Sequence, residues 1–178
     1  PPVPGASKTM SPGPRQKPIA SIVVLTWNQK ALIETLLPAI GDTTKVPHEV
    51  IVIDNGSTDD TAAFLKAYSI ERNAAAPESV RVISNPQNLG IAKGFNQGLK
   101  EAKGDYIILL HNDVVLPPKW LEHAIRHFRT DKRIGIVGPR SNVAKPHQVA
   151  QPGYRDLGEF PAFAEKFYER NQGNQTQA

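Results

Sequence analysis

Residues 106–116 of this 178-residue chain read YIILLHNDVVL, an apolar run that stops at His111-Asn112-Asp113 and then resumes. The length and composition of residues 106–110 predict a strand buried on both faces. In an open α/β sheet the ligand site lies at the carboxyl ends of the strands. A carboxylate and an amide oxygen placed there suit a hard cation such as Mg²⁺ or Mn²⁺ that is shared with a phosphate. Taken alone, the tripeptide is better explained as a polar loop that ends a strand.

Strand and helix patterns alternate on both sides of this stretch. The apolar runs predict strands at residues 19–26, 50–54, 80–83, 106–110 and 134–137. The helical patterns fall at residues 32–41, from 57 onward, and at 90–102, 117–128 and 161–170. Strands that alternate with helices of this length predict an α/β fold, with a mostly parallel sheet and helices on both faces.

The two ends of the chain lack the composition of a core. Residues 1–17 hold five prolines together with glycine and small polar residues, which is typical of a disordered linker or tail. We therefore expect the α/β domain to span residues 18–142. Residues 143–178 are expected to form a loop, a short helix and a polar tail.

Composition narrows the functional classes. The chain has no cysteine, which excludes disulfides and thiolate metal sites and fits a cytoplasmic protein, either free or peripheral at the inner face of the membrane. We expect neither a bilayer-spanning segment nor an export leader, because no long apolar run and no charged-then-apolar start are present in the sequence given. The net charge of +4 is scattered along the chain, so it favours solubility over nucleic-acid binding. A polyanion-binding domain would rest on that charge alone.

Polar residues follow three of the expected strands. They are Thr26-Trp27-Asn28 after the first, Asp54-Asn55-Gly56 after the second and His111-Asn112-Asp113 after the fourth. Each group alone could be turn or helix-cap chemistry. All three together at carboxyl ends favour one ligand crevice. A buried strand that ends on Asp54 must give that carboxylate a partner or water, and an N–H of a pyrimidine base would be such a partner.

The helix expected at residues 90–102 carries Gly90, Gly94 and Gly98, which line one face. An interior glycine costs about 1 kcal/mol relative to alanine, so a close approach of the backbone should compensate. Tight packing on the sheet and contact with a ligand are equally open explanations. Lys93 could reach a phosphate or a base, or could be an ordinary solvated lysine.

Four segments, in this order and spacing, resemble a family 2 glycosyltransferase. They read SIVVLTWN at residues 21–28, EVIVIDNGSTD at 49–59, NLGIAKGFNQG at 88–98 and LHND at 110–113. The resemblance covers roughly residues 18–142. It implies a GT-A fold, whose Rossmann-like sheet binds a nucleotide-diphosphate sugar together with Mg²⁺ or Mn²⁺.

The resemblance also implies a set of residues that bind the nucleotide sugar. They are Thr26, Trp27, Asn28, Asp54, Asn55, Gly90, Lys93, Asn112 and Asp113. Thr26 and Asn28 would line the nucleotide pocket, and Asp54 would accept from the base N–H. Lys93 would lie near the base or the diphosphate, and Asn112 beside the ribose.

In the same way, Asp113 would coordinate the metal ion. His111 stands where the family's Asp-x-Asp motif often has its first aspartate. One carboxylate holds a cation less well than two, so this difference should lower the affinity for the metal.

The activity implied is inverting, metal-assisted transfer from a UDP- or dTDP-sugar to a hydroxyl of a carbohydrate or lipid-linked acceptor, as in polysaccharide biosynthesis. The catalytic base stays unknown and is expected beyond residue 178, because nothing singles out Asp156 or Glu159, the nearest late carboxylates. The chain is then the donor-binding half of a truncated domain, inactive alone, in which residues 143–178 begin the acceptor half and further domains belong to a longer protein. The alternative is a non-catalytic nucleotide-binding or assembly module of the same fold.

Overall fold

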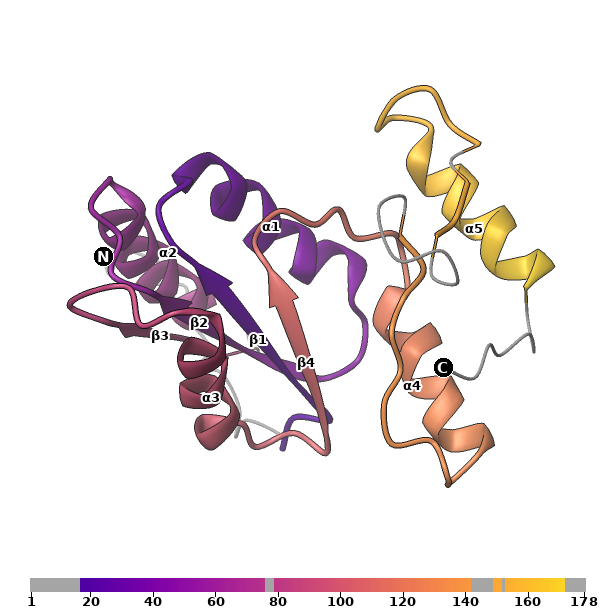
Figure 1. Ribbon diagram of the computed structural model, residues 1–178, viewed down its shortest axis with the longest axis horizontal. Coiled ribbons are helices and arrows are strands. Elements are labelled where there is room, and N and C mark those ends of the chain that lie inside the picture. Colours follow the sequence, from indigo (N-terminus) through magenta and orange to yellow (C-terminus); the bar gives the residue numbers. More distant parts are fainter. Residues whose placement is uncertain (1–16, 76–78, 142–148, 152, 172–178) are drawn as a thin grey trace, which may run out of the picture. The chain divides into compact units, whose positions relative to one another are not determined.

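A computed structural model describes residues 17–75, 79–141, 149–151 and 153–171 (Figure 1). The expected N-terminal tail, apart from Lys17, and the polar C-terminal end lie outside these ranges. The elements in chain order are β1 (Ala20–Thr26), α1 (Lys30–Thr43), β2 (His48–Asp54), α2 (Thr61–Ala75), β3 (Ser79–Ser84), α3 (Ile91–Glu101), β4 (Tyr106–His111), α4 (Trp120–Thr130) and α5 (Phe160–Arg170).

The four strands form one parallel sheet in the order β3-β2-β1-β4. Every residue of β1 and β2 is buried, which confirms the strands predicted at residues 19–26 and 50–54 and the α/β fold. Thr26 pairs with Asp54 across these strands, and Leu25 pairs with His111 of β4. The polar residues that follow β1, β2 and β4 therefore leave the sheet at the same edge.

One strand prediction is wrong, and another is wrong in its burial. Residues 134–137 form no strand, and Ile136 is 92% exposed. This apolar run is short and contains Gly135, so it has little side-chain area to bury against a neighbour. The second correction concerns β4, which is a strand as predicted but is not buried on both faces. Among the described residues it pairs with β1 alone, and about half of Ile107 and of Leu109 is exposed. Its composition is that of a central strand, but β4 is the outermost strand on one side of the sheet.

Helix α3 packs directly on the sheet. A Cβ atom added at Gly94 would lie 2.5 Å from Leu25 Cδ1, and one at Gly98 would overlap Val23 Cγ1. Phe95, on the same helix, joins the core cluster of β1 and β2 side chains. Tight packing is thus the explanation for Gly94 and Gly98, because only a residue without a side chain allows this approach.

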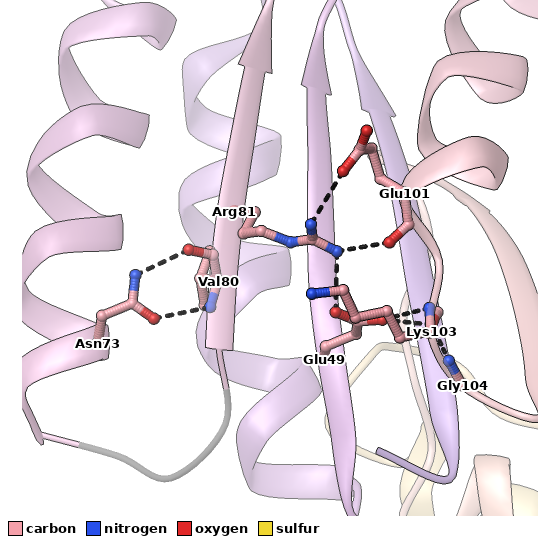
Figure 2. Close-up of polar contacts among 8 residues, drawn as sticks. Glu49, Asn73, Val80, Arg81, Glu101, Lys103 and Gly104 are labelled. Atoms are coloured by element: carbon pink, nitrogen blue, oxygen red, sulfur yellow. Dashed lines mark hydrogen bonds and ion pairs between the residues drawn. The ribbon is translucent and has the colours of Figure 1, made fainter. Parts of the chain in front are cut away.

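The buried carboxylate of Glu49 helps to fix the carboxyl end of α3 (Figure 2). Glu49 is 3% exposed and accepts hydrogen bonds from Ser21 Oγ at 2.7 Å and from the backbone N–H of Lys103 at 2.7 Å. Arg81 of β3 donates to Glu49 Oε2 at 3.0 Å and to the Glu101 carbonyl at 2.6 Å. The carboxyl end of α3 is therefore tied to three strands near their amino ends.

The chain divides into two compact units: unit 1 falls within residues 1–33 and 47–112, and unit 2 within residues 34–46 and 113–178. In unit 2, Trp120 Nε1 donates to Thr44 Oγ1 at 3.1 Å, and the Lys45 N–H donates to Glu122 at 2.8 Å. None of the helices in the described part of the chain has the length and apolar character needed to cross a bilayer. The domain boundaries expected after residues 17 and 142 stay a prediction.

Candidate functional site

Three strand ends meet at the carboxyl edge of the sheet. The Asn55 N–H donates to the Thr26 carbonyl at 2.9 Å, and Asn112 Nδ2 donates to Thr26 Oγ1 at 3.0 Å. Thr26, Asp54 and Asn112 are each less than 10% exposed. The structure thus brings together predicted site residues from β1, β2 and the end of β4.

The carboxylate of Asp54 is only partly used by the protein. One oxygen, Oδ1, accepts from the backbone N–H of Ser57 at 3.0 Å. The other oxygen accepts no hydrogen bond from the residues that the structure describes. It is also not completely closed off from solvent. A carboxylate oxygen in a nearly buried position needs a donor, so Asp54 can accept from a ligand N–H.

Asn112 presents an acceptor in the same place. Its Nδ2 group donates to Thr26 Oγ1 at 3.0 Å and to Gln29 Oε1 at 3.4 Å, which uses both of its donors. No described residue donates to its carbonyl oxygen. That oxygen suits a sugar hydroxyl or a cation.

The loop between β1 and α1 has an unusual backbone. Asn28 and Gln29 have φ angles of 57° and 60°, a left-handed conformation that costs about 1–3 kcal/mol per residue unless its surroundings hold it. Here the Asn28 N–H donates to Ser57 Oγ at 2.8 Å, and the Thr58 N–H donates to Asn28 Oδ1 at 2.8 Å. The loop is therefore joined to the loop after β2. Trp27 beside it is 52% exposed and so offers its ring to a ligand.

Asp59 strengthens the same junction. Its carboxylate accepts from the Thr61 N–H at 3.0 Å and from the Lys30 N–H at 3.3 Å, at the starts of α2 and α1. Hydrogen bonding by Thr61 lowers the pKa of Asp59 below its ordinary value. Asp59 thus stays ionised where the positive ends of the two helices favour an anion.

The predicted metal ligand, Asp113, is exposed and is the first residue after Asn112 to belong to unit 2. The ring of His111 meets Phe95 edge-on, with centroids 5.4 Å apart. Within the described ranges no three His, Cys, Asp or Glu side chains gather so that they could hold a metal ion. A cation at Asp113 would therefore need further oxygens from its ligand, as a diphosphate provides. A common cleft for Asp54 and Asp113 stays a prediction.

Gly90 and Lys93 lie at the start of α3. Gly90 has a φ of +80° and no atom within 4 Å of a Cβ built on it, so it serves the turn rather than the packing. Lys93 is exposed and has no hydrogen-bond or ion-pair partner in the part of the chain that the structure describes. Its ammonium group is free to meet an anion.

Sequence reasoning missed two polar residues near this edge, Asn85 and Gln97. They exchange two side-chain hydrogen bonds, each of 2.8 Å. Asn85 directly follows Ser84, the last residue of β3, so it leaves the sheet at the same edge as the other site residues. The sequence signal for Asn85 is a polar residue that follows the strand predicted at residues 80–83.

Comparisons with known proteins point to one family. The profile described as glycosyl transferase family 2 matches residues 21–176. Hyaluronan synthase of Pasteurella multocida is 33% identical over 128 residues, which are 71% of this chain and 13% of the synthase.

Solved structures share the fold. A mannosyltransferase from Pyrobaculum calidifontis, PcManGT, solved with GDP-Man and Mn²⁺, is 24% identical with a TM-score of 0.57, over 67% of this chain and 35% of that one. Residues 1–349 of S. aureus TarS, solved with UDP, are 27% identical with a TM-score of 0.53, over 62% of this chain and 32% of that one. The chain spans only 13% of the hyaluronan synthase and about a third of each solved transferase.

Proposed function

This chain belongs to glycosyl transferase family 2, and from that premise we propose that it is the donor-binding part of an enzyme that transfers a sugar from a UDP- or dTDP-sugar to an acceptor hydroxyl. The observation that carries the proposal is the meeting of Thr26, Asp54 and Asn112 at one sheet edge. Two acceptor oxygens there, on Asp54 and Asn112, have no donor among the described residues. A uridine nucleotide supplies donors for both.

Asp54 would recognise the nucleobase of the donor. Uracil and thymine carry an N–H at N3, and the uncommitted oxygen of Asp54 would accept from it. Asn112 would accept from a ribose hydroxyl, and the exposed ring of Trp27 would flank the nucleotide. The TarS structure holds UDP, which supports a uridine nucleotide here.

A divalent cation would act on the leaving group. Mg²⁺ or Mn²⁺ bound to Asp113 and to the diphosphate would stabilise the negative charge that develops on the nucleoside diphosphate. Lys93, which has no partner in the described ranges, would add a positive charge near the diphosphate or the base. Because only Asp113 supplies a carboxylate, the cation would bind tightly only together with the nucleotide.

The catalytic general base, which deprotonates the acceptor hydroxyl, would lie outside this chain. Asp156 Oδ1 accepts from the Gly158 N–H at 2.9 Å, so it shapes its own turn. Glu159 accepts from Arg155 Nε at 3.1 Å, and this hydrogen bonding lowers the pKa of Glu159. A carboxylate with a lowered pKa is a poor general base. We therefore expect this chain alone to bind the donor without transferring its sugar.

The full-length protein would act by inversion on a carbohydrate or lipid-linked acceptor. The similarity to hyaluronan synthase supports a place in polysaccharide biosynthesis. The enzyme would work in the cytoplasm or at the inner face of the membrane. Sugar transfer by the full-length protein, measured with a UDP-sugar donor, separates an enzyme from a binding module.

Calorimetric titration with UDP and CDP tests the role of Asp54. CDP lacks the N3–H, so it should bind wild-type protein more weakly than UDP. Asp54→Asn should weaken UDP binding about tenfold or more, because a hydrogen bond to a charged group is lost. Asp105→Asn is the matched control, since Asp105 is an exposed partner of Lys17 before β4. Equal affinities of wild-type protein for UDP and CDP would contradict base recognition by Asp54, and no binding of either would contradict the proposed function.

A further inference from the structure

The side chain of Asn55 is fully occupied inside the protein. It is 2% exposed, and its Nδ2 group donates to Asn88 Oδ1 at 2.9 Å and to the Gly90 carbonyl at 3.4 Å. Its Oδ1 accepts from Asn85 Nδ2 at 3.1 Å and from the Leu89 N–H at 3.0 Å. A primary amide has two donors and two acceptor sites, so no site is left for a ligand.

Asn85 extends this network into α3. Its own N–H donates to the Asp54 carbonyl at 2.8 Å, which fixes it to the end of β2. Its side chain donates to Gln97 Oε1 and accepts from Gln97 Nε2, each at 2.8 Å. Gln97 lies in the second turn of α3. A continuous chain of amide hydrogen bonds therefore runs from β2 through the loop at residues 85–90 to the helix that carries Lys93.

A backbone contact restrains the same loop. Gly56 has a φ of +82°, and a Cβ on it would lie 2.5 Å from Gln87 Cα and 2.8 Å from the Asn88 nitrogen. The backbones after β2 and before α3 thus touch, which only glycine permits. This contact stops the loop from moving closer to β2, and the amide network stops it from moving away.

From these contacts we infer that Asn55, Asn85 and Gln97 are positioning residues of the nucleotide site. They hold residues 88–90 and the first turn of α3, with Lys93, at a set place relative to Asp54. The inference rests on the proposed function and changes the expected role of Asn55 from contacting the nucleotide to supporting the loop that does. A loop that is already ordered loses less conformational freedom when the ligand binds, so the network raises affinity without touching the ligand.

The first test removes the network's outer pair. Gln97→Met keeps the length of the side chain and loses both hydrogen bonds to Asn85. In calorimetric titrations with UDP and Mg²⁺, its Kd should be about five to ten times that of wild-type protein. The Leu89 and Gly90 amides should also exchange hydrogen faster. Gln151→Met is the matched control, because Gln151 is exposed and has no recorded partner in the described ranges.

A second variant separates positioning from plain loss of stability. Gln97→Glu places a carboxylate oxygen against Asn85 Oδ1, which repels it. Protonation gives this side chain an O–H donor and a carbonyl acceptor, the two roles that the Gln97 amide fills toward Asn85. The ratio of its Kd to the wild-type Kd should therefore fall as the pH is lowered from about 8 to about 5. The same ratio for Gln97→Met should stay constant, since methionine does not titrate.

The outcomes are distinct. Wild-type affinity in folded Gln97→Met, or a Gln97→Glu ratio that does not change with pH, would overturn the positioning role. A wild-type protein that binds no UDP would overturn the proposed function itself. Faster exchange at Leu89 and Gly90 in Gln97→Met would then show only that the network orders the loop.

Discussion

In unit 1 every residue of β1 and β2 is buried, whereas α5 in unit 2 has no buried residue and α4 buries only Leu121 and Ile125. The residues proposed to bind the donor, Thr26, Asp54 and Asn112, all belong to unit 1. Asp113, the predicted metal ligand, begins the second segment of unit 2. The proposed nucleotide-binding residues therefore lie at the end of a buried sheet, whereas Asp113 belongs to the unit whose helices α4 and α5 bury few side chains.

The polar contacts differ in the same direction. In unit 1 the Glu49–Arg81 ion pair at 3.0 Å joins separate strands, and Glu49 is buried. In unit 2, Arg133 pairs with Asp131 and Arg155 with Glu159, so each ion pair is local in sequence and exposed on its arginine. Exposed ion pairs contribute little to stability. The two local ion pairs of unit 2 therefore add little to its stability, whereas the buried Glu49–Arg81 pair links strands of unit 1.

Hydrogen exchange should show the largest contrast. Amides of β1 and β2 should exchange only when the whole unit unfolds. Helix α5 should unfold locally, because none of its residues is fully buried. We expect exchange in the two strands to be about a thousandfold slower than in α5, after correction for sequence. Mass spectrometry on peptides from each element measures this. Equal protection of α5 and β2 would remove the contrast between the units.

A pair of glycine substitutions sharpens the account of unit 1. Gly56 and Gly90 both have φ angles near +80°, but only Gly56 is in contact with another backbone segment. Gly56→Ala should lower the free energy of unfolding by about 2–4 kcal/mol, from backbone strain and overlap with Gln87. Gly90→Ala should cost about 1–3 kcal/mol, from strain alone, because a φ of 80° with a ψ of 165° is essentially confined to glycine. Urea denaturation measures both losses. Equal losses would mean that the backbone contact at Gly56 does not add to the cost of its substitution.

The smallest effect concerns pH and unit 2. The ring of His123 in α4 stacks on Tyr168 in α5, with centroids 3.3 Å apart, and burial lowers the pKa of His123 below its ordinary value of 6.5. Its unfolded form then binds a proton more readily than its folded form. The stability that His123 gives unit 2 is therefore complete above about pH 6.5 and is lost as the pH falls below it.

His123→Phe tests this effect, because phenylalanine keeps an aromatic ring and cannot titrate. Exchange of the α4 and α5 amides is compared between wild-type protein and the variant at about pH 7.5 and pH 5.5, on either side of the ordinary histidine pKa. Only the wild-type protein should lose protection at the lower pH. The same loss in both proteins would assign the effect to another group.

The sequence was most informative where burial is complete. The apolar runs of β1 and β2 predicted their strands, and the polar residues after them marked the right edge of the sheet. The same reasoning found β4 but misjudged its burial, because composition does not tell an edge strand from a central one. It failed for residues 134–137, which have no strand to pair with among the described residues.

The roles of Asn85 and Gln97 could not be predicted from the sequence for a different reason. A neutral amide carries no pattern of its own, and its partner depends on which strands are neighbours. Only the order β3-β2-β1-β4 places Asn85 beside Asn55. The two glycines that pack on β1 were recognisable as a stripe, but the choice between packing and ligand contact needed coordinates.

The half-exposed side chains of β4 bear on how the protein behaves at high concentration. Ile107 and Leu109 point to the same side of a strand that has an open hydrogen-bonding edge in the described part of the chain. Such an edge is a template for another strand, and apolar side chains beside it favour aggregation. We therefore expect self-association of this polypeptide at high concentration to begin at the free edge of β4.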